Sequence, residues 1–178
     1  SCFDVRFELA AFGDLLDTFD GRAVDPALDG ILCLGISLPH LLTRGELDDA
    51  LRDLTACLTP GGLLLIQNRN FDAVLSTHDR WMAPQTHRQR EHEWLFVRFY
   101  DFEPGGLLRF NVLTLHREGD GPWDQRVRST RLWPLTRQDL VDALDRAGFG
   151  RVTLYGNMAG DGYDAASSPN LVAAAIKS

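Results

Sequence analysis

The sequence contains no long hydrophobic run and few cysteines. No stretch of about 18 consecutive apolar residues occurs, so no membrane span is expected, and no charged leader followed by an apolar segment precedes the first apolar run. Cys2, Cys33 and Cys57 are odd in number and far apart, with no CxxC pair. This spacing predicts neither a disulfide framework nor a zinc site. We therefore expect a reduced, cytoplasmic protein.

Positive charge is also scarce. The chain has 18 Lys and Arg against 25 Asp and Glu, a formal net charge of -7. Nucleic acids are bound through clustered Lys and Arg, so we expect no nucleic-acid partner. One segment interleaves arginines with acidic residues, namely Arg80, Arg88, Arg90 and Arg98 among Asp79, Glu91, Glu93 and Asp101. This interleaving indicates a solvated, mixed-charge surface.

No metal motif or catalytic triad is evident. The histidines outside the first strands, His78, His87, His92 and His116, have no metal-ligand spacing such as HExxH. We expect them on the surface of the protein. The sequence therefore gives no sign of a metal centre or of a dedicated nucleophile.

The composition is that of a globular domain. With 178 residues, 44% of them hydrophobic and 24% charged, the chain is long enough to bury one core. It starts at Ser1 and enters the apolar run 3–12 almost at once. We therefore expect a fragment, or a longer protein whose beginning is missing.

The first part of the chain predicts a strand, helix, strand unit. Residues 30–35 and 62–68 are continuous apolar runs, typical of parallel strands covered on both faces. Between them, Thr43 and Glu46 form a capping-box pattern that starts a leucine-rich helix. Residues 5–12 are rich in strand formers and predict a further strand.

The end of the chain predicts another helix and two strands. Thr136 and Asp139 signal a helix that ends at Gly148. Residues 151–156 and 170–177 follow as strands. Together with residues 1–74, residues 136–178 are expected to form the core of a single domain.

Residues 75–135 behave as an insert. The segments 94–102, 107–118 and 125–135 alternate in part and are joined by Gly-containing turns, which predicts three antiparallel strands. All four tryptophans lie in or near this insert. They either build a small core of its own or form a lid over a ligand.

Four segments resemble the second half of a class I S-adenosylmethionine-dependent methyltransferase. They are VRFELAAFGDL, LDGILCLGISLPHL, LTPGGLLLIQNRNFD, and LVDALDRAGFGRVTLYG followed by LVAAAIK. The resemblance implies an α/β, Rossmann-like sheet with an antiparallel last strand, lacking its N-terminal strands and carrying the antiparallel insert. The family's glycine-rich first loop has no counterpart in this chain.

More narrowly, CLGISLPHL and QNRNFD are similar to the glycine and sarcosine N-methyltransferase branch. That branch has the pattern LGNS-x-x-HL followed by RNYD, in which Asn and Arg engage an amino-acid substrate. Here Ile36 stands in place of the Asn and Phe71 in place of the Tyr, which puts glycine itself in doubt as substrate. The resemblance implies substrate binding by Ile36, Arg69 and Asn70.

Cofactor contacts follow from the resemblance and from strand ends. In an open α/β sheet, ligands bind outside the carboxyl ends of the strands, where Gly35, Ser37 and His40 are expected. The resemblance implies contacts to S-adenosylmethionine from one set of residues: Ala11, Phe12, Asp14 by a shifted register, Leu34, Gly35, Ser37 and His40.

His40 is the one candidate for a catalytic role. Two other interpretations of these residues stay open. Ser37 with Pro39 could merely cap a short helix, leaving His40 as a partly buried imidazole. Arg69 could pair with Asp72 instead of binding a carboxylate.

These patterns predict a methyltransferase that uses S-adenosylmethionine and acts on a small-molecule acceptor such as an amino-acid-like amine. The alternative is a non-catalytic, methyltransferase-like binding or assembly module. A nicotinamide-binding Rossmann domain fits the antiparallel last hairpin poorly. Whether the protein forms a homo-oligomer is left open.

Overall fold

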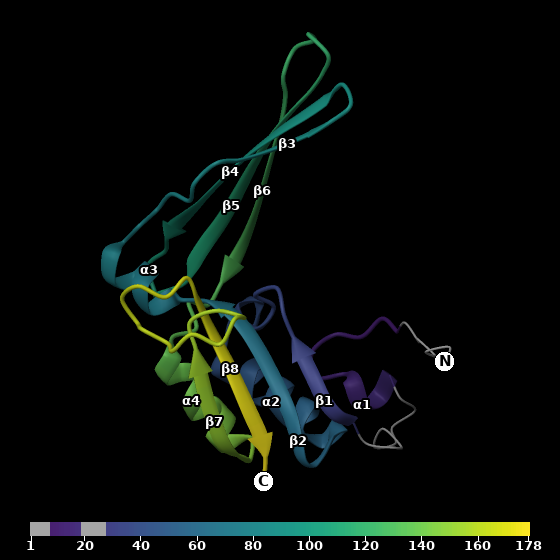
Figure 1. Ribbon diagram of the computed structural model, residues 1–178, viewed down its shortest axis with the longest axis vertical. Helices are drawn as coiled ribbons and strands as arrows, with labels where there is room; N and C mark the ends of the chain where they lie inside the picture. Colours follow the sequence, from purple (N-terminus) through teal and green to yellow (C-terminus); the bar gives the residue numbers. More distant parts are fainter. Residues whose placement is uncertain (1–7, 19–27) are drawn as a thin grey trace.

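The computed structural model describes residues 8–18 and 28–178, which form a helix-covered sheet and a long antiparallel arm (Figure 1). The first sheet has the order β1-β2-β8-β7, with β1 parallel to β2 and β8 antiparallel to both of its neighbours. Its strands are β1 (Leu28–Cys33), β2 (Leu58–Arg69), β7 (Phe149–Tyr155) and β8 (Asn170–Lys177). The predicted parallel pair and antiparallel last strand are confirmed.

Two capping boxes start the main helices. Thr43 Oγ1 accepts from the backbone N–H of Glu46 at 3.2 Å, and the Glu46 carboxylate accepts from the Thr43 N–H at 3.0 Å. The helix α2 (Arg44–Cys57) follows. Thr136 and Asp139 form the same reciprocal pair before α4 (Arg137–Arg146). Both predicted helix starts are confirmed. Such caps form because they satisfy backbone N–H donors of the first helical turn.

Both helices pack on one face of the first sheet. Apolar residues of α2 and α4 enclose the main core with β2 and β8, through Leu47, Leu51, Leu54, Leu140, Leu144, Leu64, Ile66, Ala173 and Ala175. On the other face, Leu63 and Leu65 are only half-buried. The sequence predicted that helices cover both faces of this sheet. Within the described residues, helices cover one face.

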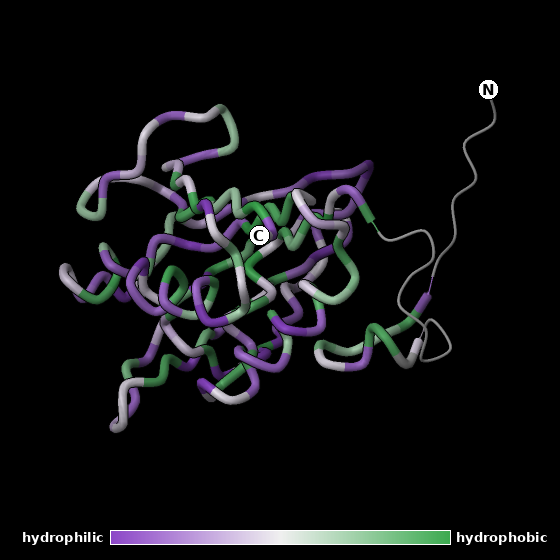
Figure 2. Tube along the Cα trace, turned by 90° about the horizontal axis from the view of Figure 1, so that it is seen from below, coloured by the Kyte–Doolittle hydropathy of each residue, from purple (hydrophilic) through white to green (hydrophobic). Residues whose placement is uncertain are grey.

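The segment before β1 corrects one prediction. Residues 8–12 are irregular and turn at Phe12 and Gly13 instead of forming a strand, while residues 5–7 lie outside the described residues. Gly13 has φ +89°, a conformation that ends an extended run. The short helix α1 (Leu15–Thr18) follows and contacts α2 (Figure 1). Figure 2 shows the molecule from below, with its hydrophobic segments in green.

The arm has four strands where three were predicted. They are β3 (Gln85–Gln89), β4 (His92–Phe102), β5 (Leu108–Glu118) and β6 (Asp124–Leu132), paired in that order. β3 was missed because its sequence QTHRQ is polar and fully exposed, so it carries no apolar alternation.

The base of the arm is buried against the helix α3 (Phe71–Thr77), which was not predicted. This second core contains Phe71, Val74, Tyr100, Leu108 and Leu132. No tryptophan belongs to it, so the tryptophans do not build one insert core. Among the described residues, no helix is long and apolar enough to cross a membrane.

α1 is attached through one buried carboxylate of α2. Asp53, 7% exposed, accepts from the backbone N–H of Leu15 at 2.8 Å and of Leu16 at 3.3 Å. Because hydrogen bonds to a charged group contribute about 1.5–3 kcal/mol, Asp53→Ala should detach α1. We expect hydrogen exchange at the Leu15 and Leu16 amides to accelerate about tenfold or more.

The matched control is Asp49→Ala on the same helix, since Asp49 is exposed and, within residues 8–18 and 28–178, its carboxylate pairs with Arg52 alone. This variant should leave both exchange rates unchanged. Equal protection of Leu15 and Leu16 in the two variants would refute the attachment.

Candidate functional site

The carboxyl ends of β1 and β2 meet at one edge of the sheet. The loop after β1 is held to β2 by Gln67, whose Oε1 accepts from the Gly35 N–H at 3.0 Å. The backbone carbonyl of Gln67 accepts from the Ile36 N–H at 3.2 Å. Gln67 therefore places this loop next to Arg69, the last residue of β2.

The loop has an unusual backbone. Gly35 has φ +80° and Ile36 has φ +64°, both in the left-handed region. For a β-branched residue this conformation costs on the order of 1–3 kcal/mol. The Ile36 side chain packs against the second core at the base of the arm. Asn tolerates this backbone better, which gives a conformational reason for the Asn of the family pattern.

Ser37 stands at the start of a short 3-10 helix, Leu38–His40. Its hydroxyl does not cap that helix but donates to the Leu34 carbonyl at 2.9 Å. The short helix therefore exists, as one interpretation required, while Ser37 tightens the loop instead of capping it. Two acceptor lone pairs of the hydroxyl remain for a ligand.

A cavity of about 390 Å³ runs along β1. It brings together four of the predicted cofactor residues, Ala11, Phe12, Leu34 and Ser37. The rest of its lining is apolar or small: Ala10, Leu15, Leu28, Ile31, Leu32, Cys33, Leu54 and Cys57. Its size and lining are those of a small-molecule site.

β1 is the edge strand of the described sheet, and apolar side chains on it and directly after it are exposed. Leu28, Leu32 and Leu34 are 37%, 64% and 43% exposed. Several exposed apolar side chains along the unpaired edge of a sheet are uncommon in a free-standing sheet. The cavity is therefore bounded on one side by this open edge.

Three predicted cofactor residues do not line that cavity. Asp14 is exposed, and Gly35 lies in the loop with its N–H engaged by Gln67. His40 is exposed at the end of the 3-10 helix, and its side chain lines neither this cavity nor the next. Their cofactor roles, and the catalytic role of His40, stay predictions.

A second cavity of about 150 Å³ lies between α3 and the arm. Arg69, Trp81 and Tyr100 line it, together with Asn70, Ala73, Val74, Thr77, Asp79, Ala166 and Ser168. Burial raises the pKa of the Tyr100 hydroxyl above its usual 10.0, although Arg69 and Arg98 lower it in part. Tyr100 is therefore a neutral hydrogen-bond donor at physiological pH.

Arg69 is not paired with Asp72. The Asp72 carboxylate accepts from the backbone N–H of Arg137 and from the Tyr163 hydroxyl, both at 2.8 Å. The Arg69 side chain makes no hydrogen bond or ion pair with the described residues, so its guanidinium is available to a ligand. A guanidinium in this state can bind a carboxylate through two parallel hydrogen bonds.

Asn70 is buried and its amide is fully used within the protein. The amide nitrogen donates to the carbonyls of Ala165 at 3.0 Å and Ser168 at 2.9 Å. Its oxygen accepts from the Ala73 N–H and from the Tyr163 hydroxyl. Asn70 thus caps α3 and holds the loop before β8, and the expected substrate contact stays a prediction.

Sequence reasoning did not single out Asn68, the most unusual polar side chain near this edge. It is fully buried, and neither its amide nitrogen nor its oxygen meets a hydrogen-bond partner in the described part of the chain. The signal was present, since a polar pair, Gln67 and Asn68, ends an apolar strand. Tyr100 and Trp81 had no comparable signal because they reach the site from the distant arm.

The site offers no activated nucleophile or metal centre. Burial raises the pKa of the Cys33 thiol to about 11, so it stays protonated at neutral pH. Among residues 8–18 and 28–178, no group of three or more His, Cys, Asp or Glu side chains could hold a metal ion. The arrangement is suited to binding and aligning two small molecules.

Comparison with known proteins finds no matching family model. The glycine/sarcosine N-methyltransferase of Aphanothece halophytica is 24% identical over 141 residues, 76% of this chain and 47% of that protein. Rat glycine N-methyltransferase is 42% identical over 53 residues, 28% of this chain and 18% of that protein. The chain thus spans less than half the length of these curated relatives.

Solved structures show the same fold. DesVI of Streptomyces venezuelae matches with a TM-score of 0.69 at 16% identity, over 85% of this chain and 59% of DesVI. The amino pentose methyltransferase CalS10 of Micromonospora echinaspora, solved with S-adenosylmethionine bound, matches with a TM-score of 0.67 at 19% identity, over 85% of this chain and 59% of CalS10.

The fold is therefore that of the class I S-adenosylmethionine-dependent methyltransferases, as the sequence resemblance implied. Within this class, the chain is similar in sequence to glycine and sarcosine N-methyltransferases.

Asn68 allows a direct test of the cost of its buried amide. Replacing an unsatisfied buried polar group by an apolar group of similar size removes a desolvation penalty of about 1–3 kcal/mol. We expect Asn68→Leu to raise the free energy of unfolding by about 1–2 kcal/mol, measured by urea denaturation.

The control is Asn111→Leu in the arm. Asn111 is also buried, but its amide donates to Asp101 at 2.8 Å and accepts from Ser129 at 2.6 Å. That variant should destabilise the protein. A loss of stability in both variants would mean that the Asn68 amide is satisfied.

Proposed function

We propose that the protein transfers a methyl group from S-adenosylmethionine to a small, amine-bearing acceptor. The observation that carries this proposal is the placement of two cavities at neighbouring strand ends. One is apolar and bounded by Phe12, Leu34 and Ser37; the other contains the free guanidinium of Arg69 and the phenol of Tyr100. The loop clamped by Gln67 lies at this same edge.

The first cavity suits the cofactor. Its apolar lining fits an adenosine moiety, and the Ser37 hydroxyl can accept from an amine. When bound, S-adenosylmethionine supplies a methyl group already activated by its sulfonium. The protein then needs to align donor and acceptor and exclude water, which contributes on the order of 7–11 kcal/mol.

The second cavity suits the acceptor. Arg69 would hold a carboxylate in two parallel hydrogen bonds, and the neutral Tyr100 hydroxyl would donate to a second acceptor atom. A water molecule occupies about 30 Å³ in the liquid, so a cavity of about 150 Å³ has room for a molecule of a few heavy atoms. The names of the sequence relatives, which are glycine and glycine/sarcosine N-methyltransferases, support an amine acceptor.

The cofactor assignment is tested by calorimetric titration of S-adenosylhomocysteine. We expect micromolar binding to the protein expressed from its natural gene. Leu34→Asp, which places a charge in the apolar cavity, should abolish binding. The control is Val127→Asp on the arm, where the side chain is 58% exposed and the substitution should change nothing.

Parallel titration of the 178-residue chain measures how far the open edge of β1 weakens the site. If the protein and the chain both fail to bind, the methyltransferase proposal is wrong and the alternative of a binding or assembly module is favoured.

The role of Arg69 is tested by measuring the KM for the acceptor and the KM for S-adenosylmethionine separately. With amino-acid-like amines as acceptors, Arg69→Gln should raise the acceptor KM about tenfold or more, because a charge-assisted pair is lost. The KM for S-adenosylmethionine should change little. Arg151→Gln, an exposed arginine on β7, is the control. Equal increases in both constants for Arg69→Gln would disprove its assignment.

A further inference from the structure

The two faces of the arm carry charge in different ways. On one face three carboxylates are paired with arginine: Asp101 with Arg80 at 2.6 Å, Glu93 with Arg88 and Arg117, and Glu103 with Arg131 at 2.8 Å. Because alternate residues of a strand point to opposite faces, these acidic residues share one face of β4 and its extension. These three acidic residues thus lie on one face of the arm together with their arginine partners.

The opposite face has arginines without acidic partners. Arg98 on β4 and Arg126 and Arg128 on β6 share it by strand register, through their β5 partners. None of the three forms an ion pair among the described residues, and the Nε of Arg98 is buried with no hydrogen-bond partner there. Asp124, one row beyond Arg126, makes no ion pair with it. We call Arg98, Arg126 and Arg128, with the residues between them, the arginine face.

The pairing register arranges these residues in two adjacent rows. Phe96 stands opposite Thr114, which stands opposite Arg126. In the next row Arg98 stands opposite Val112, which stands opposite Arg128. Backbone spacings are about 7 Å between residues on one strand face and about 10 Å across two strands. Three long, flexible guanidinium side chains can therefore converge above Val112 and Thr114.

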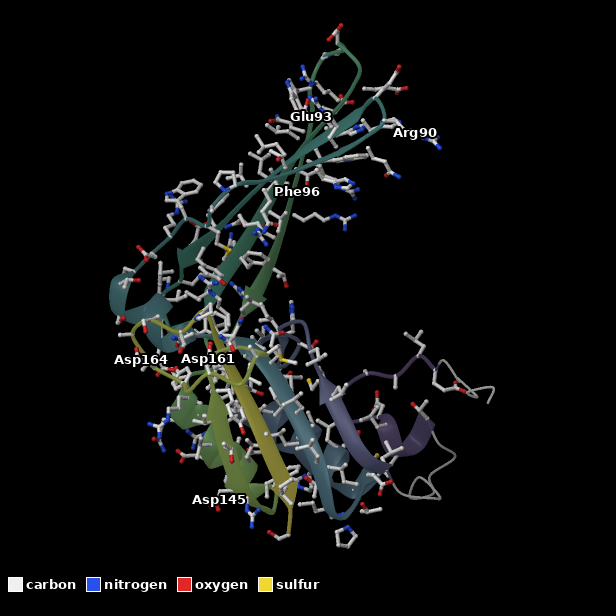
Figure 3. The ribbon with its side chains drawn as sticks, viewed as in Figure 1. Arg90, Glu93, Phe96, Asp145, Asp161 and Asp164 are labelled. Carbon is white, nitrogen blue, oxygen red and sulfur yellow. The ribbon has the colours of Figure 1, made fainter. Side chains whose placement is uncertain are left out.

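An aromatic cluster adjoins the two rows. Trp94 stacks on His116 with ring centres 5.0 Å apart, and His116 stacks on His92 at 5.4 Å. Figure 3 shows Phe96 midway along the arm, below Glu93 and Arg90 near its tip. The arginine face thus combines positive charge with flat apolar surface.

The arginine face continues along β4 toward the carboxyl ends of β1 and β2. Tyr100 follows Arg98 on the same face and belongs to the second core with Phe71, and Ile36 packs against this core. Tyr100 also lines the cavity that contains Arg69. A ligand held at the arginine face can thus extend toward the proposed acceptor cavity.

We propose that the arginine face binds a phosphate group of the acceptor, so that the methylated substrate is a phosphorylated small molecule. This proposal rests on the proposed function and specifies its substrate. Three unpaired guanidinium groups match the two charges and multiple acceptor oxygens of a phosphate. A second copy of the same face would bring like charges together. The net charge of -7 and the small number of free arginines disfavour a nucleic acid.

The test is an NMR titration of the protein with inorganic pyrophosphate, which follows the Arg98 Nε–H and the Trp94 indole N–H. We expect both signals to shift. In the double variant Arg126→Gln/Arg128→Gln, the affinity should fall about tenfold or more, since two charge-assisted contacts are lost. The control is Arg88→Gln/Arg90→Gln, which removes the same charge from the other face and the turn and should change the affinity less than about twofold.

Equal weakening in the two double variants would overturn the proposal, because binding would then reflect net charge alone. It would also be overturned if pyrophosphate shifted neither signal, or if a single-stranded oligonucleotide bound more tightly than pyrophosphate. Titration of S-adenosylhomocysteine into the same samples distinguishes a failure of the phosphate-site proposal from a failure of the methyltransferase proposal. Loss of cofactor binding with retained, face-specific pyrophosphate binding would remove the methyltransferase proposal and leave the phosphate site.

Discussion

The parallel pairing of β1 with β2 is the constraint on which the site depends. It brings the carboxyl ends of both strands to one edge, with Cys33 opposite Ile66. One residue beyond Ile66, Gln67 binds the loop after β1 through its side chain and its backbone. Without this clamp, the loop from Leu34 to Ser37 would lose its register against Arg69. The two cavities would then no longer share an edge.

Successive residues of a strand point to opposite faces, so the charged residues of the arm have different roles on its two faces. Ion pairs on one face link neighbouring strands, as when Glu103 joins Arg109 on β5 to Arg131 on β6. Pairs of this kind contribute little individually, but they link neighbouring strands on this face. The other face keeps its arginines unneutralised beside the strand ends. Net charge alone, which is negative, would not reveal a positive face of this kind.

Local signals were predictable from the sequence, and long-range partnerships were not. The capping boxes at Thr43 and Thr136 depend on residues three positions apart, and both were predicted correctly. β3 has no apolar pattern and exists because β4 offers it an edge, so the sequence alone could not indicate it. For Asn70 the sequence predicted a substrate contact, but its amide partners lie more than ninety positions away in the loop before β8.

Two energetic costs of the fold lie near the carboxyl ends of β1 and β2. Ile36 adopts a left-handed backbone although it is β-branched, and Asn68 buries an amide without a partner. Ile36 donates its backbone N–H to the Gln67 carbonyl, and Asn68 directly follows Gln67 in the sequence. The helices α2 and α4, by contrast, follow ordinary capping and packing rules. Strain and unsatisfied polar groups persist where the surrounding structure holds them for a purpose other than stability. The position of Ile36 and Asn68 near Arg69 therefore favours placing the chemistry at this edge.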